Sequence, residues 1–221
     1  MCFDAKTSII TFIIGTIFNL LGIIYFKDSI YTAMALVWQF VLSMQIFDAI
    51  AWLNNKCGTF WNKFATRGAY VANMMQPVAI FMAFIAITPV SRQLKIIATI
   101  LITIYIGWIL GTSQNIGKKD CLVPDNSCNH LDYYWWNLNQ NQTKKQSSIN
   151  INFVMYFITL SSIIFLLVRP FSLSIINYTY ITITLLISSF LYKCGTASIW
   201  CFFAAFAPIL NFVVYKYILK K

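Results

Sequence analysis

The chain has 221 residues, of which 59% are hydrophobic and only 10% are charged, and its formal net charge is +10. A soluble domain carries about 45–50% apolar and about 25% charged residues, so this composition excludes an ordinary soluble domain and predicts that most of the chain lies in lipid. The basic residues stand singly or in pairs between apolar runs, which is typical of membrane-flanking anchors that contact lipid phosphates and argues against nucleic-acid binding.

Seven apolar stretches approach the length of about 20 residues with which a helix spans a bilayer. They are apolar all round, without the alternation that a transmembrane β-strand requires. The expected spans are 8–26, 30–53, 68–88, 94–111, 151–168, 172–192 and 196–219. The sequence therefore predicts a single-domain, all-α bundle of seven transmembrane helices. We expect the first span to be an uncleaved helix rather than a signal peptide, and Pro208 to kink the last one.

One connection is long and polar, and it covers residues 112–150 between the fourth and fifth spans. It contains a glycosylation acceptor pattern at Asn141. It also contains an aromatic run, 131–136, with two tyrosines and two tryptophans. Such residues are typical of the membrane–water interface, and the alternative interpretation is a patch that binds a protein partner. This loop is therefore where we expect any protein partner to bind.

An odd number of spans puts the two chain ends on opposite sides of the membrane, which we name the N-terminal side and the C-terminal side. All six cysteines lie on the N-terminal side or within about two helical turns of it. This clustering indicates an oxidising compartment and predicts one or two disulfides among Cys57, Cys121 and Cys128, with the pairing left open. Outside the long loop, the C-terminal side carries slightly more basic residues. We expect the N-terminus to be luminal or extracellular and the C-terminus to be cytosolic.

Asp48 is the only acidic residue inside a predicted span. With a rise of about 1.5 Å per helical residue, Asp48 and Asn73 lie at one depth, and Gln45 and Gln76 lie one turn deeper. Because the second and third spans are consecutive and antiparallel, Asp48 is expected to meet Asn73, and Gln45 to meet Gln76, with Pro77 freeing a backbone carbonyl nearby. Three interpretations stay open: interhelical packing, a ligand or ion site, and a proton-titrating carboxylate.

The chain opens with Met1-Cys2-Phe3, carries Gln45, Asp48 and Trp52 in the second span, and has a Ser-x-Trp-Cys-Phe run at 198–202. In these features it resembles a group of uncharacterised small multi-pass membrane proteins found in giant DNA viruses and some bacteria. The acid of the second span is usually Glu in the bacterial members, whereas this chain has Asp. The resemblance does not cover the long loop and implies no particular activity, but it implies a multi-pass membrane protein.

All six acidic residues are aspartates, there is no glutamate, and His130 is the single histidine. Catalysis and metal binding draw mostly on these residue types, so we expect no enzymatic activity, no cofactor and no metal site. The sequence predicts a viral, non-enzymatic structural or partner-binding component of a host endomembrane, plasma membrane or virion membrane, in contact with the lipid bilayer. Two alternatives remain, a small transporter or channel with its polar site around Asp48, and a receptor-like seven-helix protein.

Overall fold

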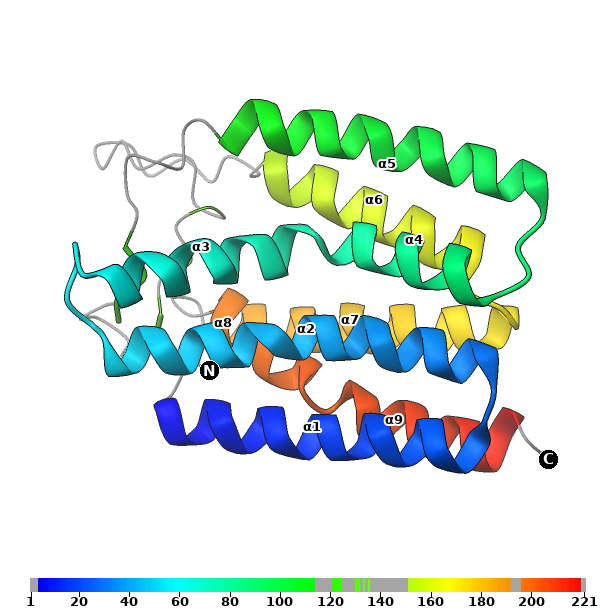
Figure 1. Cartoon of the computed structure of the whole chain (residues 1–221), viewed down its shortest axis with the longest axis horizontal. Coiled ribbons are helices and arrows are strands. Elements are labelled where there is room, and N and C mark those ends of the chain that lie inside the picture. The colour runs from blue at the N-terminus through cyan, green and yellow to red at the C-terminus, as the bar shows by residue number, and fades with distance from the viewer. Residues whose placement is uncertain are drawn as a thin grey trace.

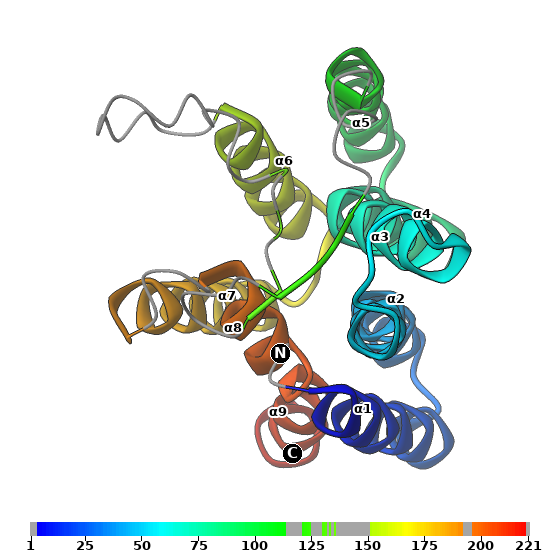
Figure 2. The same ribbon diagram turned by 90° about the vertical axis from the view of Figure 1, so that its left-hand side faces the viewer.

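The computed structural model describes residues 4–113, 121–124, 130, 131, 133, 135, 151–191 and 196–219. Within these residues every regular element is a helix, and one isolated β-bridge joins Pro124 to Leu131. The predicted all-α class is therefore confirmed. Figure 1 shows the helices lying lengthwise beside one another, and Figure 2 shows the same bundle from its end.

The helices follow the order of the predicted spans, and the third and seventh spans are each interrupted. Their bounds are α1 Ala5–Phe26, α2 Ser29–Leu53, α3 Phe60–Met74, α4 Gln76–Ile87, α5 Arg92–Ser113, α6 Ile151–Leu167, α7 Phe171–Leu191, α8 Thr196–Ala204, α9 Ala207–Val214 and a final π-helical segment, η3, Tyr215–Leu219.

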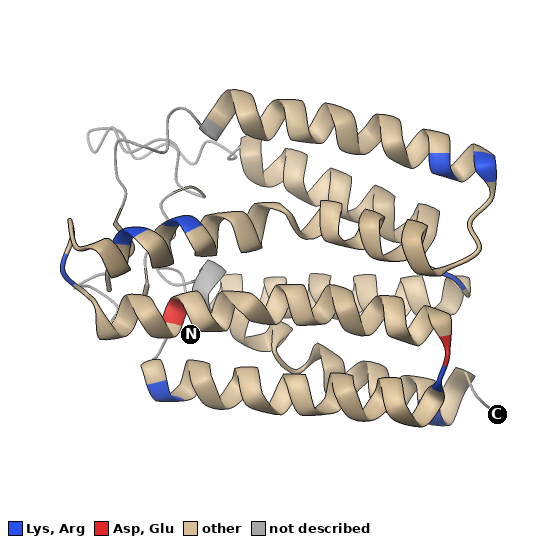
Figure 3. Ribbon diagram, viewed as in Figure 1, with Lys and Arg blue, Asp and Glu red and all other residues tan. Residues whose placement is uncertain are grey.

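Several of these helices have the properties of membrane spans. Among the described residues, α1, α2, α5, α7 and the stretch Ile199–Leu219 are long and apolar enough to cross a bilayer, and the bent pair α3–α4 adds a sixth if it counts as one span. Helix α6 is apolar but has only 17 residues. Lys and Arg gather towards the two ends of the bundle, and its middle is free of them in the drawn view (Figure 3). These features are those of a multi-pass membrane protein.

Side-chain caps fix where three of the helices begin. Asp4 accepts a hydrogen bond from the amide of Thr7 (2.6 Å) before α1, and Asp28 accepts from two first-turn amides of α2 (2.8 and 3.0 Å). Thr59 caps α3 through the amide of Asn62 (3.3 Å). Helix α3 therefore begins eight residues before the expected start at Gly68. Hydropathy does not reveal this extension because its first two turns mix aromatic with polar and basic side chains.

The third span bends by 57° between α3 and α4, at Met75. Pro77 follows the bend and has no amide hydrogen to donate, so a helix cannot run through it with all its hydrogen bonds intact. The carbonyl of Met74 accepts a hydrogen bond from the Tyr105 hydroxyl of α5 (2.8 Å). The neighbouring helix thus supplies a donor at the break, which a bilayer interior requires.

The seventh predicted span is also interrupted, between α8 and α9 just before Pro208, where the sequence predicts a kink. The carbonyl of Phe203 accepts from the Tyr180 hydroxyl of α7 (2.5 Å). Helix α1 approaches this break closely at Gly15, where an added Cβ would lie 3.1 Å from the carbonyl oxygen of Ala205. The missing side chain at Gly15 therefore allows the two backbones to pack closely at this crossing.

At the C-terminal side, aromatic rings join the α1–α2 turn to the last helix. The ring of Phe26 lies 4.8 Å from that of Tyr31, 5.2 Å from that of Phe212 and 5.1 Å from that of Tyr215, measured between centroids. The Tyr215 hydroxyl also donates a hydrogen bond to Asp28. Ring contacts of this kind add to the area that the aromatic side chains bury, and they fix this end of the bundle.

Candidate functional site

Asp48 is completely buried within α2. Its Oδ1 accepts a hydrogen bond from the Tyr133 hydroxyl at 2.5 Å, and Tyr133 belongs to the long loop rather than to a helix. Burial, together with the adjacent carboxylate, raises the pKa of Tyr133 well above its usual 10.0, so this hydroxyl keeps its proton and acts as the donor. A residue 85 positions away in sequence thus provides a partner for the one acid that lies inside a predicted span.

The long loop is attached to the N-terminal end of the bundle by a disulfide between Cys57 and Cys121, whose Cα atoms are 5.3 Å apart. The backbone amide and carbonyl of the next residue, Leu122, both form hydrogen bonds to α3. Its amide donates to Thr66 Oγ1 (2.8 Å), and its carbonyl accepts from Asn62 Nδ2 (2.8 Å), both on α3. The third candidate, Cys128, lies outside the described residues, and Cys201 is a free, buried thiol. We refer to residues 121–124, 130, 131, 133 and 135 as the docked segment.

Alternate residues of the aromatic run are buried within the protein. Leu131, Tyr133 and Trp135 expose 3% or less of their surface. Trp135 makes edge-to-face ring contacts with Tyr70 of α3 (5.7 Å) and with Tyr133 (5.0 Å). These three residues therefore hold the loop on the bundle. Residues 132, 134 and 136 of the run lie outside the described part of the chain.

Gln45 connects three helices by its side chain. Its Nε2 donates to the carbonyl of Cys201 on α8 (3.1 Å), and its Oε1 accepts from Thr11 Oγ1 on α1 (3.3 Å). These bonds replace the expected pairing with Gln76. Gln45 therefore acts as an interhelical packing contact, the first of the three interpretations open for the cluster.

Asn73 and Gln76 meet at a sulfur atom of α2. The amide nitrogens of both side chains lie 3.6 Å from the Sδ of Met44, which is a weak acceptor. Gln76 Oε1 also accepts a hydrogen bond from the Tyr156 hydroxyl of α6 (2.5 Å). The four polar residues predicted from sequence are thus neighbours on α2 and α3–α4, but their described bonds run to other residues rather than between Asp48 and Asn73.

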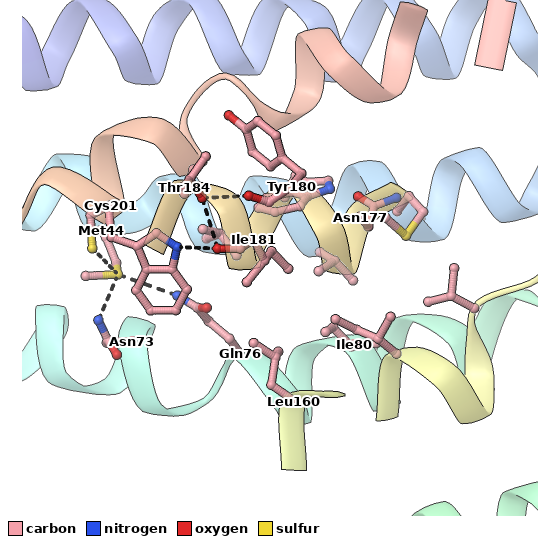
Figure 4. A pocket seen from close by; sticks show the side chains of 18 residues that line it. Met44, Asn73, Gln76, Ile80, Leu160, Asn177, Tyr180, Ile181, Thr184 and Cys201 are labelled. Carbon is pink, nitrogen blue, oxygen red and sulfur yellow. Dashed lines mark hydrogen bonds between the residues drawn. The ribbon is translucent and has the colours of Figure 1, made fainter. Parts of the chain in front are cut away.

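A central cavity lies among α2, α4, α6, α7 and α8, with Asn73 at the end of α3 on its border (Figure 4). The cavity has a volume of about 50 Å³. Its described lining includes Asn73 and Gln76 but neither Gln45 nor Asp48, and it contains no charged side chain. The polar cluster is therefore divided, since two of its members face a neutral cavity and the other two join structural elements.

Asparagines deeper in the bundle make packing contacts between helices. Asn19 Nδ2 donates to Gln39 Oε1 (3.1 Å). Asn177 and Asn211 exchange two amide hydrogen bonds of 3.0 and 3.1 Å between α7 and α9. The sequon at Asn141 lies outside the described residues. Within the part of the chain that the structure describes, no group of three or more His, Cys, Asp or Glu side chains could hold a metal ion.

The fold and the site define a class, that of helical multi-pass membrane proteins with a disulfide-tethered loop. Comparison with protein families, with curated proteins and with solved structures finds no match for this chain. The function therefore has to be argued from the residues themselves.

Proposed function

We propose that the protein is a viral integral membrane protein that acts without catalysis, as a structural or partner-binding component. In this proposal it crosses the membrane seven times, because α3–α4 forms one bent span and α6 forms another. The 17 residues of α6 extend about 25 Å, which is near the lower limit for a span. The viral origin rests on the resemblance described for both chain ends and the second span.

The observation that carries the proposal is the double attachment of the long loop. The Cys57–Cys121 disulfide and the Tyr133–Asp48 hydrogen bond hold it at two separate points of the bundle. The docked segment, held in this way, offers a fixed surface, and a fixed surface binds a partner without the entropic cost of ordering a flexible chain. We propose that the N-terminal side is luminal or extracellular, since disulfides persist in oxidising compartments.

The transporter alternative is less well supported. Charged residues that serve transport usually face a water-filled path, whereas Asp48 is fully buried and is bonded to the docked segment. The receptor-like alternative has some support from the central cavity, but the cavity lining carries no charge to attract an ionic ligand.

Site-specific photo-crosslinking tests the proposed role in membranes that contain the protein. A benzophenone amino acid is placed at Val123 in the docked segment, and a matched control is placed at the lipid-facing Ile24, which is 68% exposed. Partner binding predicts one discrete protein adduct from position 123, lost in Cys121→Ser, and only lipid adducts from position 24. Solute or ion flux in reconstituted vesicles that Asp48→Asn abolishes would contradict the proposal and favour a transporter.

Protease protection of terminal tags tests the number of spans. In intact cells, seven spans predict cleavage of an N-terminal tag and protection of a C-terminal tag until the membrane is permeabilised. Six spans predict that both tags behave alike. That result would refute an odd number of spans but would not affect the proposed partner binding of the loop.

A further inference from the structure

A second cavity lies at the C-terminal side of the bundle, at the other end from the docked segment. It has a volume of about 220 Å³ and is lined by the start of α2, the end of α4, the start of α5 and the end of α6. All four helix ends lie at the same end of the bundle (Figure 1). At such ends a chain enters or leaves the hydrocarbon layer of a bilayer, so this C-terminal cavity lies at the depth of lipid headgroups.

The lining of the C-terminal cavity changes from polar to apolar along the bundle. Ser91 and Arg169 stand in the connections outside the helices, and both are exposed. Phe84 and Leu166 belong to the last turns of α4 and α6, and Leu94 belongs to the first turn of α5. A phospholipid has the same order, since its charged headgroup lies outside its apolar chains. The cavity therefore matches the boundary between the two parts of a lipid.

The charge around the C-terminal cavity is positive. Arg169 belongs to the described lining, and Arg92 and Lys95 follow the lining residue Ser91 at the start of α5. The described lining contains no acidic residue. The acid nearest to it in sequence, Asp28, already accepts hydrogen bonds from two amides of α2 and from a tyrosine of the last helix. A cavity whose walls carry one sign of charge concentrates ions of the opposite sign, so the complementary ligand is an anion.

The chemistry of Arg169 favours a phosphate group among anions. Its Nη1 donates a hydrogen bond to the backbone carbonyl of Phe165 (3.1 Å), one turn back on α6. This bond holds the guanidinium beside the end of α6 and uses one of its five N–H donors. The planar arrangement of the other donors fits two oxygens of a phosphate. In a membrane, lipid phosphates are the anions at this depth.

We infer that the C-terminal cavity binds the phosphate group of an anionic phospholipid, with Arg169 as its ligand and the apolar wall in contact with the adjoining acyl chain. Basic pockets between transmembrane helices bind lipid headgroups in this way. The C-terminal side, which we propose to be cytosolic, faces the leaflet that is rich in anionic lipids. This lipid site is separate from the partner-binding role proposed for the docked segment.

Native mass spectrometry of the full-length protein in detergent measures lipid binding directly. The probes are phosphatidylserine and phosphatidylcholine with identical acyl chains, which differ in net charge. We expect one saturable adduct with phosphatidylserine and about fivefold weaker binding of phosphatidylcholine, which is the factor that one basic residue near the surface contributes. Equal affinity for the two lipids would overturn the inference, because it would show that charge does not select the ligand.

Variants on the same side of the membrane separate a specific site from diffuse attraction. Arg169→Gln should weaken phosphatidylserine binding about tenfold or more, which is the factor that a hydrogen bond to a charged group contributes. Arg169→Lys keeps the charge but not the planar fork, so its loss should be smaller. Lys216→Gln is the matched control, because it removes the same charge at an exposed position that does not line the cavity. Val90→Trp fills the cavity from the α4–α5 connection and should prevent binding.

The pattern across these variants decides the outcome. Loss of binding in Arg169→Gln and Val90→Trp, with wild-type binding in Lys216→Gln, supports the site. An equal loss in Arg169→Gln and Lys216→Gln would refute it in favour of diffuse attraction. Displacement of phosphatidylserine by inorganic phosphate would also refute it, since a soluble phosphate would then be the ligand. Circular dichroism and gel filtration verify folding, and Leu94→Trp replaces Val90→Trp if that variant does not fold.

Discussion

Removal of a single hydroxyl group should weaken the attachment of residues 130–135 of the long loop to the bundle. In Tyr133→Phe the ring and its contact with Trp135 remain, but the hydrogen bond to Asp48 is lost. The buried carboxylate then loses a donor at a position from which water is excluded, because Asp48 exposes none of its surface. The substitution therefore acts on the attachment of the loop rather than on its packing.

The magnitude follows from the type of bond. A hydrogen bond to a charged group contributes about 1.5–3 kcal/mol. Since about 1.4 kcal/mol corresponds to a factor of ten in an equilibrium constant, the undocked population of the loop should rise about 10- to 150-fold. The disulfide at Cys121 keeps the first part of the docked segment in place, so the effect should be largest for residues 130–135.

Hydrogen exchange measured by mass spectrometry tests this expectation on peptides that cover 121–135 and α2. Tyr25→Phe is the matched control. Tyr25 is 62% exposed, and this substitution also removes one hydroxyl group but leaves the loop contacts unchanged. Faster exchange in residues 130–135 of Tyr133→Phe alone supports the reasoning. Exchange equal to that of the wild type would show that the Tyr133–Asp48 bond does not hold the loop. A double-mutant cycle with Asp48→Asn then measures the coupling between the two side chains.

Two further substitutions probe packing and tethering. Gly22→Ala places a methyl group in the space of the Tyr31 ring and should destabilise the protein by about 1–3 kcal/mol, which lowers its thermal unfolding temperature in detergent. Gly107→Ala is the control, because nothing lies within 4 Å of the added Cβ, and it should not lower that temperature. Cys121→Ser opens a link across 64 residues, for which chain entropy predicts a loss of up to about 4 kcal/mol. An unfolding midpoint in denaturant equal to that of the wild type would contradict it.

The sequence predicts the helices well because lipid demands long apolar helices whose backbone is satisfied internally. The order of the elements, the long loop and the kink at Pro208 all follow from apolar runs and proline positions. The early start of α3 does not, because a cap at Thr59 and a mixed aromatic and basic face have no hydropathy signal. Pro77 marks the place of the 57° bend at Met75, but the donor to the Met74 carbonyl, Tyr105 of α5, cannot be assigned before the helices are placed.

The sequence predicts which residues belong to the candidate site but not how they contact one another. Depth along each helix brings Gln45, Asp48, Asn73 and Gln76 into one region, but depth does not fix the rotation of a helix about its axis. Rotation decides that Asn73 and Gln76 face the cavity while the other two do not. The partner of Asp48 is missed for a different reason, since Tyr133 sits in a polar loop whose aromatic residues suggested an interfacial position.

The described aspartates share one role, because each accepts hydrogen bonds within the protein. Asp4 accepts from a first-turn amide of α1, Asp28 accepts from first-turn amides of α2 and from Tyr215, and Asp48 accepts from Tyr133. Each lies at a junction, either at the start of a helix or where the loop meets the bundle. A carboxylate is an acceptor with two oxygens, so it can collect several donors where the helical hydrogen-bond pattern ends. In a chain with few acids, those at the described junctions are thus occupied as structural hydrogen-bond acceptors.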